Sequence, residues 1–117
     1  QGNLVLLARH AGAIVGFISS GPVRSLPGYG ADGEIYALYL LARYHGQGIG
    51  SRLFRSAARH WVEKGGKSLV VMFLAGNSKA GVFYEAMGGK EVGRSAYEIA
   101  GKSFEDIAII FDDPTGY

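Results

Sequence analysis

Three glycines within five positions form the part of this sequence best suited to binding an anion. Gly46, Gly48 and Gly50 lie in the segment 44–51, between an apolar strand pattern and the first turn of a predicted helix. Such a junction presents unpaired backbone N–H groups and the positive end of a helix dipole. Glycine lacks the Cβ that would keep a bulky anion away from those groups. The segment therefore predicts a phosphate or pyrophosphate site, although glycines can also serve only to shape a tight turn.

Two other nucleotide-binding patterns begin in this sequence, and neither is completed. Residues 28–33 follow the G-x-G-x-x-G order of dinucleotide sites, but they precede a predicted strand instead of joining a strand to a helix. The G-K-S triplets at 66–68 and 101–103 match the end of an ATP-binding loop, yet Trp61 and Ala96 stand where its first glycine belongs. Neither pattern predicts a site.

The distribution of charge also favours a local anion site. The net charge of +2 is too small to indicate binding to nucleic acid. The stretch from Ile35 to Val62 contains no Asp or Glu, but it is rich in basic side chains. These are Arg43, His45, Arg52, Arg55, Arg59 and His60. A solvated helix face accounts for some of the arginines, but it does not account for the glycines that interrupt the stretch.

Apolar periodicity predicts an α/β fold around this segment. Ile49, Leu53, Ala57 and Trp61 recur every four residues, which is the spacing of one helix face. The predicted strands are 4–8, 13–19, 34–41, 68–74, 92–100 and 102–111, and the predicted helices are 49–64 and 78–87. The order is β-β-β-α-β-α-β-β. We expect a mixed central sheet, with antiparallel hairpins at both ends, a parallel pair in the middle, and 34–41 buried on both faces.

Length and composition limit the class of protein. The 117 residues, 48% of them hydrophobic, provide for one core, so residues 1–117 are expected to form a single domain. The sequence has no cysteine, no signal-peptide pattern and no apolar run near the length of a membrane span, which predicts a soluble, cytoplasmic protein. The three histidines lack metal-ligand spacing, so no metal is expected. Gln1 is not an initiator methionine, and we expect a further segment upstream of it.

Two motifs resemble those of a known family, the GNAT family of N-acetyltransferases. His45-Gly46-Gln47-Gly48-Ile49-Gly50 approximates the family's [RQ]-x-x-G-x-[GA] signature, which follows a central strand. Residues 77–88, N-S-K-A-G-V-F-Y-E-A-M-G, match its N-x-x-A-x-x-F-Y-x-x-x-G helix. Each motif lies on the expected element and at the expected separation. The sequence departs from the family pattern at His45, Ala42 and Gly89, where Arg or Gln, proline and an aromatic residue are usual.

The resemblance implies a GNAT-like mixed sheet that lacks the family's usual N-terminal strand and two helices. It also implies transfer of an acetyl group from acetyl-CoA, as cosubstrate, to a primary amine by direct attack, without a metal. The residues implied in cofactor binding comprise part of a bulged strand, the glycine-rich turn and a helix start. They are Leu38, Tyr39, Leu40, His45, Gly46, Gln47, Gly48, Ile49, Gly50, Ser51 and Asn77. Arg52 and Arg55 are further candidates for contacts with phosphate.

Two side chains are candidates for proton transfer. The resemblance makes Glu34 the base that takes the amine's proton, and burial at the strand start is expected to raise its pKa into a useful range. The alternative is an ordinary charged residue at a strand end. Tyr84 resembles the family's general acid, which protonates the departing thiolate, and the alternative is a core tyrosine. Asn77 resembles a residue that binds the pantetheine arm, and its alternative is a helix N-cap.

The expected partners follow from the same reading. The acceptor is a small-molecule or peptide amine that the sequence does not identify, and neither nucleic acid nor membrane is expected. Exposed strand edges at the N-terminal side predict a homodimer. Two other functions stay open: a non-catalytic acyl-CoA-binding module, and a nucleotide-binding α/β protein.

Overall fold

The computed structural model describes residues 3–116, so Gln1 lies outside the described part of the chain. The elements are β1 (Leu4–His10), β2 (Ala13–Pro22), β3 (Gly33–Leu40), the short 3₁₀ helix η1 (Ala42–Tyr44), α1 (Ile49–Glu63), β4 (Leu69–Leu74), α2 (Ser78–Ala86), β5 (Lys90–Ile99) and β6 (Lys102–Phe111). The predicted order of strands and helices is confirmed. Only η1, which lies between the predicted strand 34–41 and the predicted helix 49–64, was not anticipated as an element.

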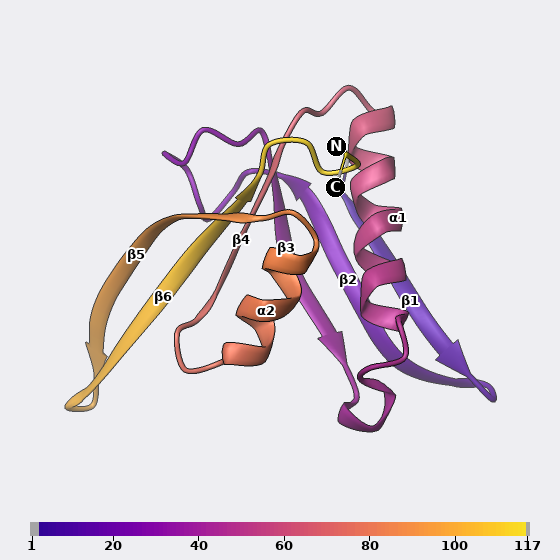
Figure 1. The fold of residues 1–117 in the computed structure, drawn as a ribbon, viewed down its shortest axis with the longest axis horizontal. Coiled ribbons are helices and arrows are strands. Elements are labelled where there is room, and N and C mark those ends of the chain that lie inside the picture. Colours follow the sequence, from indigo (N-terminus) through magenta and orange to yellow (C-terminus); the bar gives the residue numbers. More distant parts are fainter. Residues whose placement is uncertain (1–2, 117) are drawn as a thin grey trace.

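The strands form one mixed sheet in the order β1-β2-β3-β4-β6-β5. β3 and β4 are parallel neighbours, as the strand-helix-strand pattern predicts, and the other pairs are antiparallel. The parallel pairing is limited to Gly33 with Leu69 and Glu34 with Val70. Beyond these pairs the two strands diverge toward their C-terminal ends (Figure 1). The sheet therefore opens between β3 and β4.

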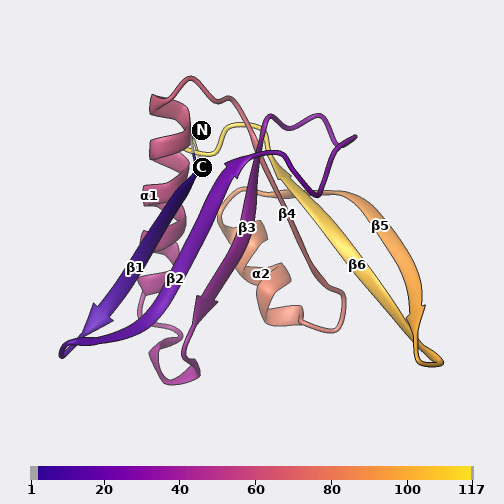
Figure 2. The same cartoon turned by 180° about the vertical axis from the view of Figure 1, so that it is seen from behind.

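Both helices lie on the same face of the sheet (Figure 1), and the view from behind shows the strands uncovered (Figure 2). The prediction that β3 is buried on both faces is therefore wrong. Its first residues are buried, but Tyr39 near its end is 54% exposed, on the face opposite the helices, where its ring lies 6.3 Å from that of Phe17. A run of apolar residues indicates burial, but it does not show which face is covered.

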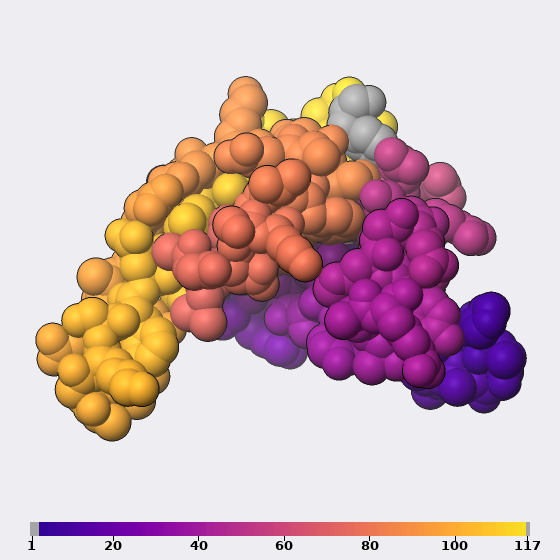
Figure 3. Space-filling model, turned by 60° about the horizontal axis from the view of Figure 1, so that its bottom comes forward, coloured from indigo at the N-terminus to yellow at the C-terminus, as the bar shows by residue number. Residues whose placement is uncertain are grey.

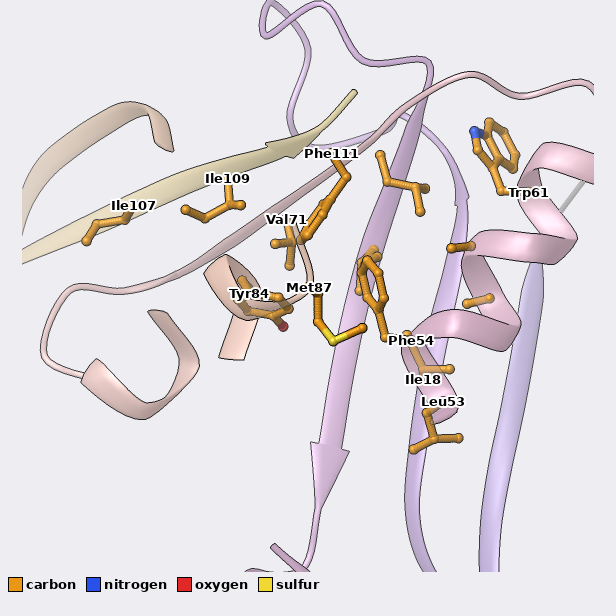
Figure 4. Packing of buried hydrophobic residues seen from close by; sticks show 14 residues of the cluster. Ile18, Leu53, Phe54, Trp61, Val71, Tyr84, Met87, Ile107, Ile109 and Phe111 are labelled. Atoms are coloured by element: carbon orange, nitrogen blue, oxygen red, sulfur yellow. The ribbon is translucent and has the colours of Figure 1, made fainter. Parts of the chain in front are cut away.

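The core between the helices and the sheet is rich in aromatic rings (Figure 4). The predicted apolar face of α1 is buried, and Phe54 from that helix lies 4.7 Å from Phe111 of β6, measured between ring centroids. α2 contributes Phe83 and Tyr84, which pack against the same cluster. This packing holds the N-terminal ends of both helices near the opening between β3 and β4.

Asp32 ties the start of β3 to the end of α1 and the start of β4. Its carboxylate accepts hydrogen bonds from Trp61 Nε1 at 2.9 Å, from the Lys67 N–H at 2.9 Å and from the Ser68 N–H at 3.0 Å. Desolvation by burial raises the pKa of Asp32, but the hydrogen bonds from Trp61, Ser68 and Lys67 outweigh it. The pKa of this carboxyl therefore lies below its usual value of 3.8.

We expect Asp32→Asn to lower the free energy of unfolding by about 1–3 kcal/mol at neutral pH, because an amide cannot accept all of these bonds. Because the folded-state pKa of Asp32 is lowered, its carboxylate stabilises the fold at pH values above the unfolded-state pKa of 3.8. That stabilisation is lost as the pH falls through the folded-state pKa. The difference between wild type and variant should therefore shrink below about pH 4. Urea unfolding across this range measures it, with exposed Asp112→Asn as the control. Equal pH dependence in wild type and Asp32→Asn would contradict the assignment.

Candidate functional site

A cleft of about 410 Å³ opens where β3 and β4 diverge. In Figure 3 the magenta surface of the segment around η1 and the salmon surface of α2 lie on either side of it. Its walls come from the end of β3, the glycine-rich turn with the first turn of α1, and α2. The lining residues are Leu38, Leu40, His45, Gly46, Gly48, Gly50, Ser51, Asn77, Lys79, Ala80, Phe83 and Tyr84. Residues far apart in the sequence thus meet at one opening.

The glycine-rich turn has the geometry that an anion site requires. Gly46 and Gly48 adopt φ values of 77° and 82°, in the left-handed region that side chains with a Cβ rarely enter. Gly48 is the N-cap of α1, and no side chain caps the helix. The Arg52 N–H donates to the Gly48 carbonyl at 3.1 Å, so the preceding N–H groups of the first turn have no acceptor within the helix. A Cβ added at Gly48 would meet nothing within 4 Å, so the turn faces open space.

Not every residue predicted for the cofactor site lines the cleft. The Gln47 side chain folds back and donates to the Arg43 carbonyl at 3.2 Å, and Ile49 packs against the core. Tyr39 lies on the opposite face of the sheet. Alternation along β3 explains this, because Leu38 and Leu40 share one face while Tyr39 takes the other. The irregularity in β3 lies opposite Ser19 and Ser20, upstream of the predicted 38–40 segment.

Asn77 is the N-cap of α2 and also lies in the lining of the cleft. Its side-chain oxygen accepts a hydrogen bond from the Ala80 N–H at 3.2 Å, which makes it the N-cap of α2. The same residue lines the cleft. Because the cap uses the oxygen, the amide nitrogen of the side chain is the group left to donate to a ligand.

Tyr84 brings a protonated hydroxyl to the cleft. The residue is 6% exposed, and its ring lies 5.9 Å from Phe73 and 6.1 Å from Phe111 within the core cluster (Figure 4). Desolvation by burial raises the pKa of this phenol to about 12, so the hydroxyl keeps its proton at neutral pH. Among residues 3–116, no fully buried side-chain oxygen lacks a partner. The Tyr84 hydroxyl, which bonds to none of these residues, therefore reaches the accessible space of the cleft.

Glu34 is buried, as predicted, but the predicted direction of its pKa shift is wrong. The side chain is 2% exposed and accepts hydrogen bonds from the N–H groups of Arg24, Ser25 and Leu26 and from the Ser25 hydroxyl. Desolvation by burial raises the pKa of Glu34, but these hydrogen bonds outweigh it and leave the pKa below the usual value of 4.5. Glu34 begins β3 and is not among the residues that line the cleft.

The structure adds lining residues that sequence reasoning missed. Lys79, Ala80 and Phe83 follow Asn77 on α2 and line the cleft beside Tyr84. These three residues could have been predicted from the sequence, because they belong to the motif 77–88. Arg52 and Arg55 are exposed on α1 and are not among the lining residues. Lys79 and His45 are therefore the basic side chains of this lining, which includes no carboxylate from the described part of the chain.

Within 3–116, no group of three or more His, Cys, Asp or Glu side chains is placed to hold a metal ion. No helix in this part of the chain has the length and hydropathy needed to cross a membrane.

The known proteins that are similar to this chain include acetyltransferases. A family model described as "Acetyltransferase (GNAT) family" matches residues 1–88. The uncharacterized N-acetyltransferase YuaI of Bacillus subtilis (strain 168) is 34% identical over 102 residues, which are 87% of this chain and 58% of that protein. The chain thus spans little more than half the length of this curated relative.

Solved structures share the fold at lower identity. A ribosomal-protein-alanine N-acetyltransferase from Brucella melitensis has a TM-score of 0.79 at 24% identity, over 94% of this chain and 68% of the other. The second structure is a Bacillus anthracis str. Ames protein assigned as a streptothricin acetyltransferase, in complex with acetyl coenzyme A. It has a TM-score of 0.82 at 19% identity, over 96% of this chain and 63% of the other. These likenesses establish the predicted mixed-sheet fold.

Proposed function

The chain belongs to the GNAT family of acetyltransferases, and we propose that it transfers an acetyl group from acetyl-CoA to a primary amine. In this proposal residues 1–117 act as one acetyltransferase domain. The observation that carries it is the cleft, which joins an uncapped helix start to a buried, protonated tyrosine. A long thioester that carries phosphates at one end is the kind of ligand that such a cleft suits. The relative named as an N-acetyltransferase and the neighbour crystallised with acetyl coenzyme A support the same choice.

In this proposal different parts of the cleft receive different parts of acetyl-CoA. The N–H groups at the start of α1 and the glycines at 46, 48 and 50 would receive the phosphates, with Lys79 as a nearby cation. The pantetheine arm would lie along Leu38 and Leu40 of β3, where the sheet opens and backbone groups lack a strand partner on the β4 side. The side-chain amide of Asn77 would donate to the arm from the other wall.

The chemistry needs a proton donor near the sulfur. The amine nitrogen attacks the thioester carbonyl, a C–N bond forms, the C–S bond breaks, and the amine loses a proton to water. The departing thiolate takes the proton of the Tyr84 hydroxyl, which solvent then restores. Backbone N–H groups near Leu40 would polarise the carbonyl oxygen during the attack. Tyr84 thus supplies the acid, and β3 supplies the electrostatic stabilisation.

We assign Glu34 a structural role, which differs from the base suggested by the sequence. Its carboxylate already accepts four hydrogen bonds from residues 24–26, so it anchors the loop between β2 and β3. We expect Glu34→Gln to lower the free energy of unfolding by about 1–3 kcal/mol, while turnover by folded molecules changes less than about tenfold. Chemical unfolding and thiol-release assays on the same preparation measure the two effects.

Ser25→Ala is the matched control for Glu34→Gln, because it removes one donor and leaves the carboxylate in place. Under the anchoring role it reproduces part of the stability loss. A fall in turnover of about 10²-fold in Glu34→Gln with unchanged stability would restore the base assignment.

The experiment that tests the proposed function has two stages. Acetyl-CoA, but not ATP or NAD, should raise the melting temperature, because a ligand that binds only the native state stabilises it. Incubation of the protein with acetyl-CoA and a panel of amines should then release free thiol. Stabilisation without thiol release from any amine would favour a non-catalytic acyl-CoA-binding module. Stabilisation by ATP or NAD alone would favour the nucleotide-binding alternative.

The proposal includes a homodimer that forms through the β1 edge of the sheet. β1 is the outermost strand on its side, and Val5, Leu7 and Ile14 around it are 63%, 46% and 51% exposed. An exposed strand edge with apolar neighbours favours pairing with another chain. We expect light scattering at micromolar concentration to show a dimer that Leu7→Lys dissociates. Ile99→Lys, an equal change at the opposite edge, should leave it intact, and a monomeric wild type would contradict the proposal.

A further inference from the structure

One hydrogen bond determines which nitrogen of His45 carries the proton. The Nε2 atom of His45 lies 2.9 Å from the carbonyl oxygen of Leu40, at the end of β3. A carbonyl oxygen can only accept, so Nε2 must be the donor. In the neutral ring the other nitrogen, Nδ1, then has no hydrogen and presents a lone pair.

That lone pair is open to a ligand, because no residue within 3–116 donates a hydrogen bond to Nδ1. His45 itself lines the cleft beside Gly46 and Gly48. A phosphate oxygen that approaches this turn meets a repulsive lone pair when the ring is neutral. When the ring is protonated it meets a charged N–H donor, and such charge-assisted bonds are among the stronger ones in proteins.

The elements that adjoin His45 carry basic side chains. α2 contributes Lys79 to the cleft, η1 contributes Arg43, and α1 contributes Arg52 in its first turn. From β1, the ring of His10 packs 5.6 Å from that of Tyr44, the residue before His45. No carboxylate of residues 3–116 is among the cleft's lining. Bound phosphates would bring negative charge beside these side chains and so favour the protonated form of the ring.

We propose that His45 takes up a proton when the phosphates of CoA bind, so that affinity for the cosubstrate increases as the pH falls through the neutral range. The inference rests on the proposed function, because it places phosphates at the glycine-rich turn. Imidazole is the side chain whose ordinary titration falls in that range. The usual Arg or Gln at this position would have a constant charge, so the pH dependence would be specific to a chain with histidine there.

Calorimetric titration of the dimer or monomer as purified tests the proposal. CoA binding is measured at about pH 6 and about pH 8, each in two buffers that differ in ionisation enthalpy, which reports the protons taken up. We expect affinity to be about three- to tenfold higher at the lower pH, with net proton uptake. Dephospho-CoA is titrated in parallel because the 3′-phosphate of CoA itself titrates near pH 6.

The variants separate His45 from other titrating groups. His45→Gln should bind CoA with only the pH dependence that the phosphate of the ligand itself causes. His45→Arg should bind CoA tightly at both pH values. His10→Gln and His60→Gln should retain the behaviour of the wild type. The inference would be overturned if the affinity of His45→Gln for CoA kept the pH dependence of the wild type. It would also be overturned if the wild type bound CoA with the same affinity at both pH values. Failure of the wild type to bind CoA at either pH would overturn the proposed function instead, and melting curves without ligand check that each variant is folded.

Discussion

Replacing Tyr84 with phenylalanine should reduce turnover by about 10²-fold or more, while affinity for acetyl-CoA changes little. The change keeps the ring, which packs against Phe73 and Phe111, and removes only the hydroxyl proton. The departing thiolate then has to be protonated by water. Release of free thiol measures turnover, and calorimetric titration measures affinity.

Stability provides the second measurement on Tyr84→Phe. The hydroxyl makes no hydrogen bond within residues 3–116, so the variant should unfold at nearly the same denaturant concentration as the wild type. A core tyrosine with a bonded hydroxyl would show the opposite pattern, with lower stability and normal turnover in folded molecules. Tyr39→Phe, on the open face of the sheet, is the matched control and should leave both quantities unchanged. Wild-type turnover in Tyr84→Phe would remove the role of acid.

The pH dependence of turnover is a consequence of the same burial. Desolvation raises the pKa of Tyr84 from 10.0 to about 12, so the phenol stays protonated well above neutral pH. Tyr84 should therefore cause no fall in turnover between neutral pH and about pH 10. For the fold, the raised pKa contributes stability that is present below 10.0 and is lost as the pH rises through the folded value.

Replacing Gly48 with glutamate should abolish the thermal shift produced by acetyl-CoA, with affinity lowered by about 10²-fold or more. A carboxylate at this position would face the open cleft where we propose that the phosphates bind, and juxtaposed like charges cost several kcal/mol. The left-handed φ of 82° adds conformational strain of about 1–2 kcal/mol for any residue with a Cβ. The melting temperature with and without acetyl-CoA separates the loss of binding from the loss of stability.

Two variants divide the effect of Gly48→Glu between charge and strain. Gly48→Lys carries the same strain with the opposite charge and should bind at least as well as a neutral replacement. Gly28→Glu introduces the same side chain at a φ of 94°, away from the cleft lining, and should keep the full thermal shift. An undiminished shift in Gly48→Glu would show that the turn is not the anion site. Equal losses in the Glu and Lys variants would assign the effect to strain.

Strand and helix types were predictable because their signals are local. The four-residue spacing from Ile49 to Trp61 predicted α1 and its buried face, and both are confirmed. Strand ends were less predictable, since β2 continues past the predicted residue 19 to Pro22. That extension depends on the pairing of Pro22 with Gly33, which lies beyond a loop. The apolar pattern of β2 itself does not indicate this pairing.

The sequence by itself determined that the glycine-rich turn, Asn77 and Tyr84 are candidate site residues, because each belongs to a short motif on one element. Only the tertiary structure decided that these two motifs face each other across one cleft, and that Lys79 joins them. The tertiary structure also decided that the pKa of Glu34 lies below its usual value. Apolar neighbours in sequence predict burial, and burial alone raises a carboxyl pKa. The donors that lower it come from residues 24–26, which reach Glu34 only because the loop before β3 folds back onto the sheet.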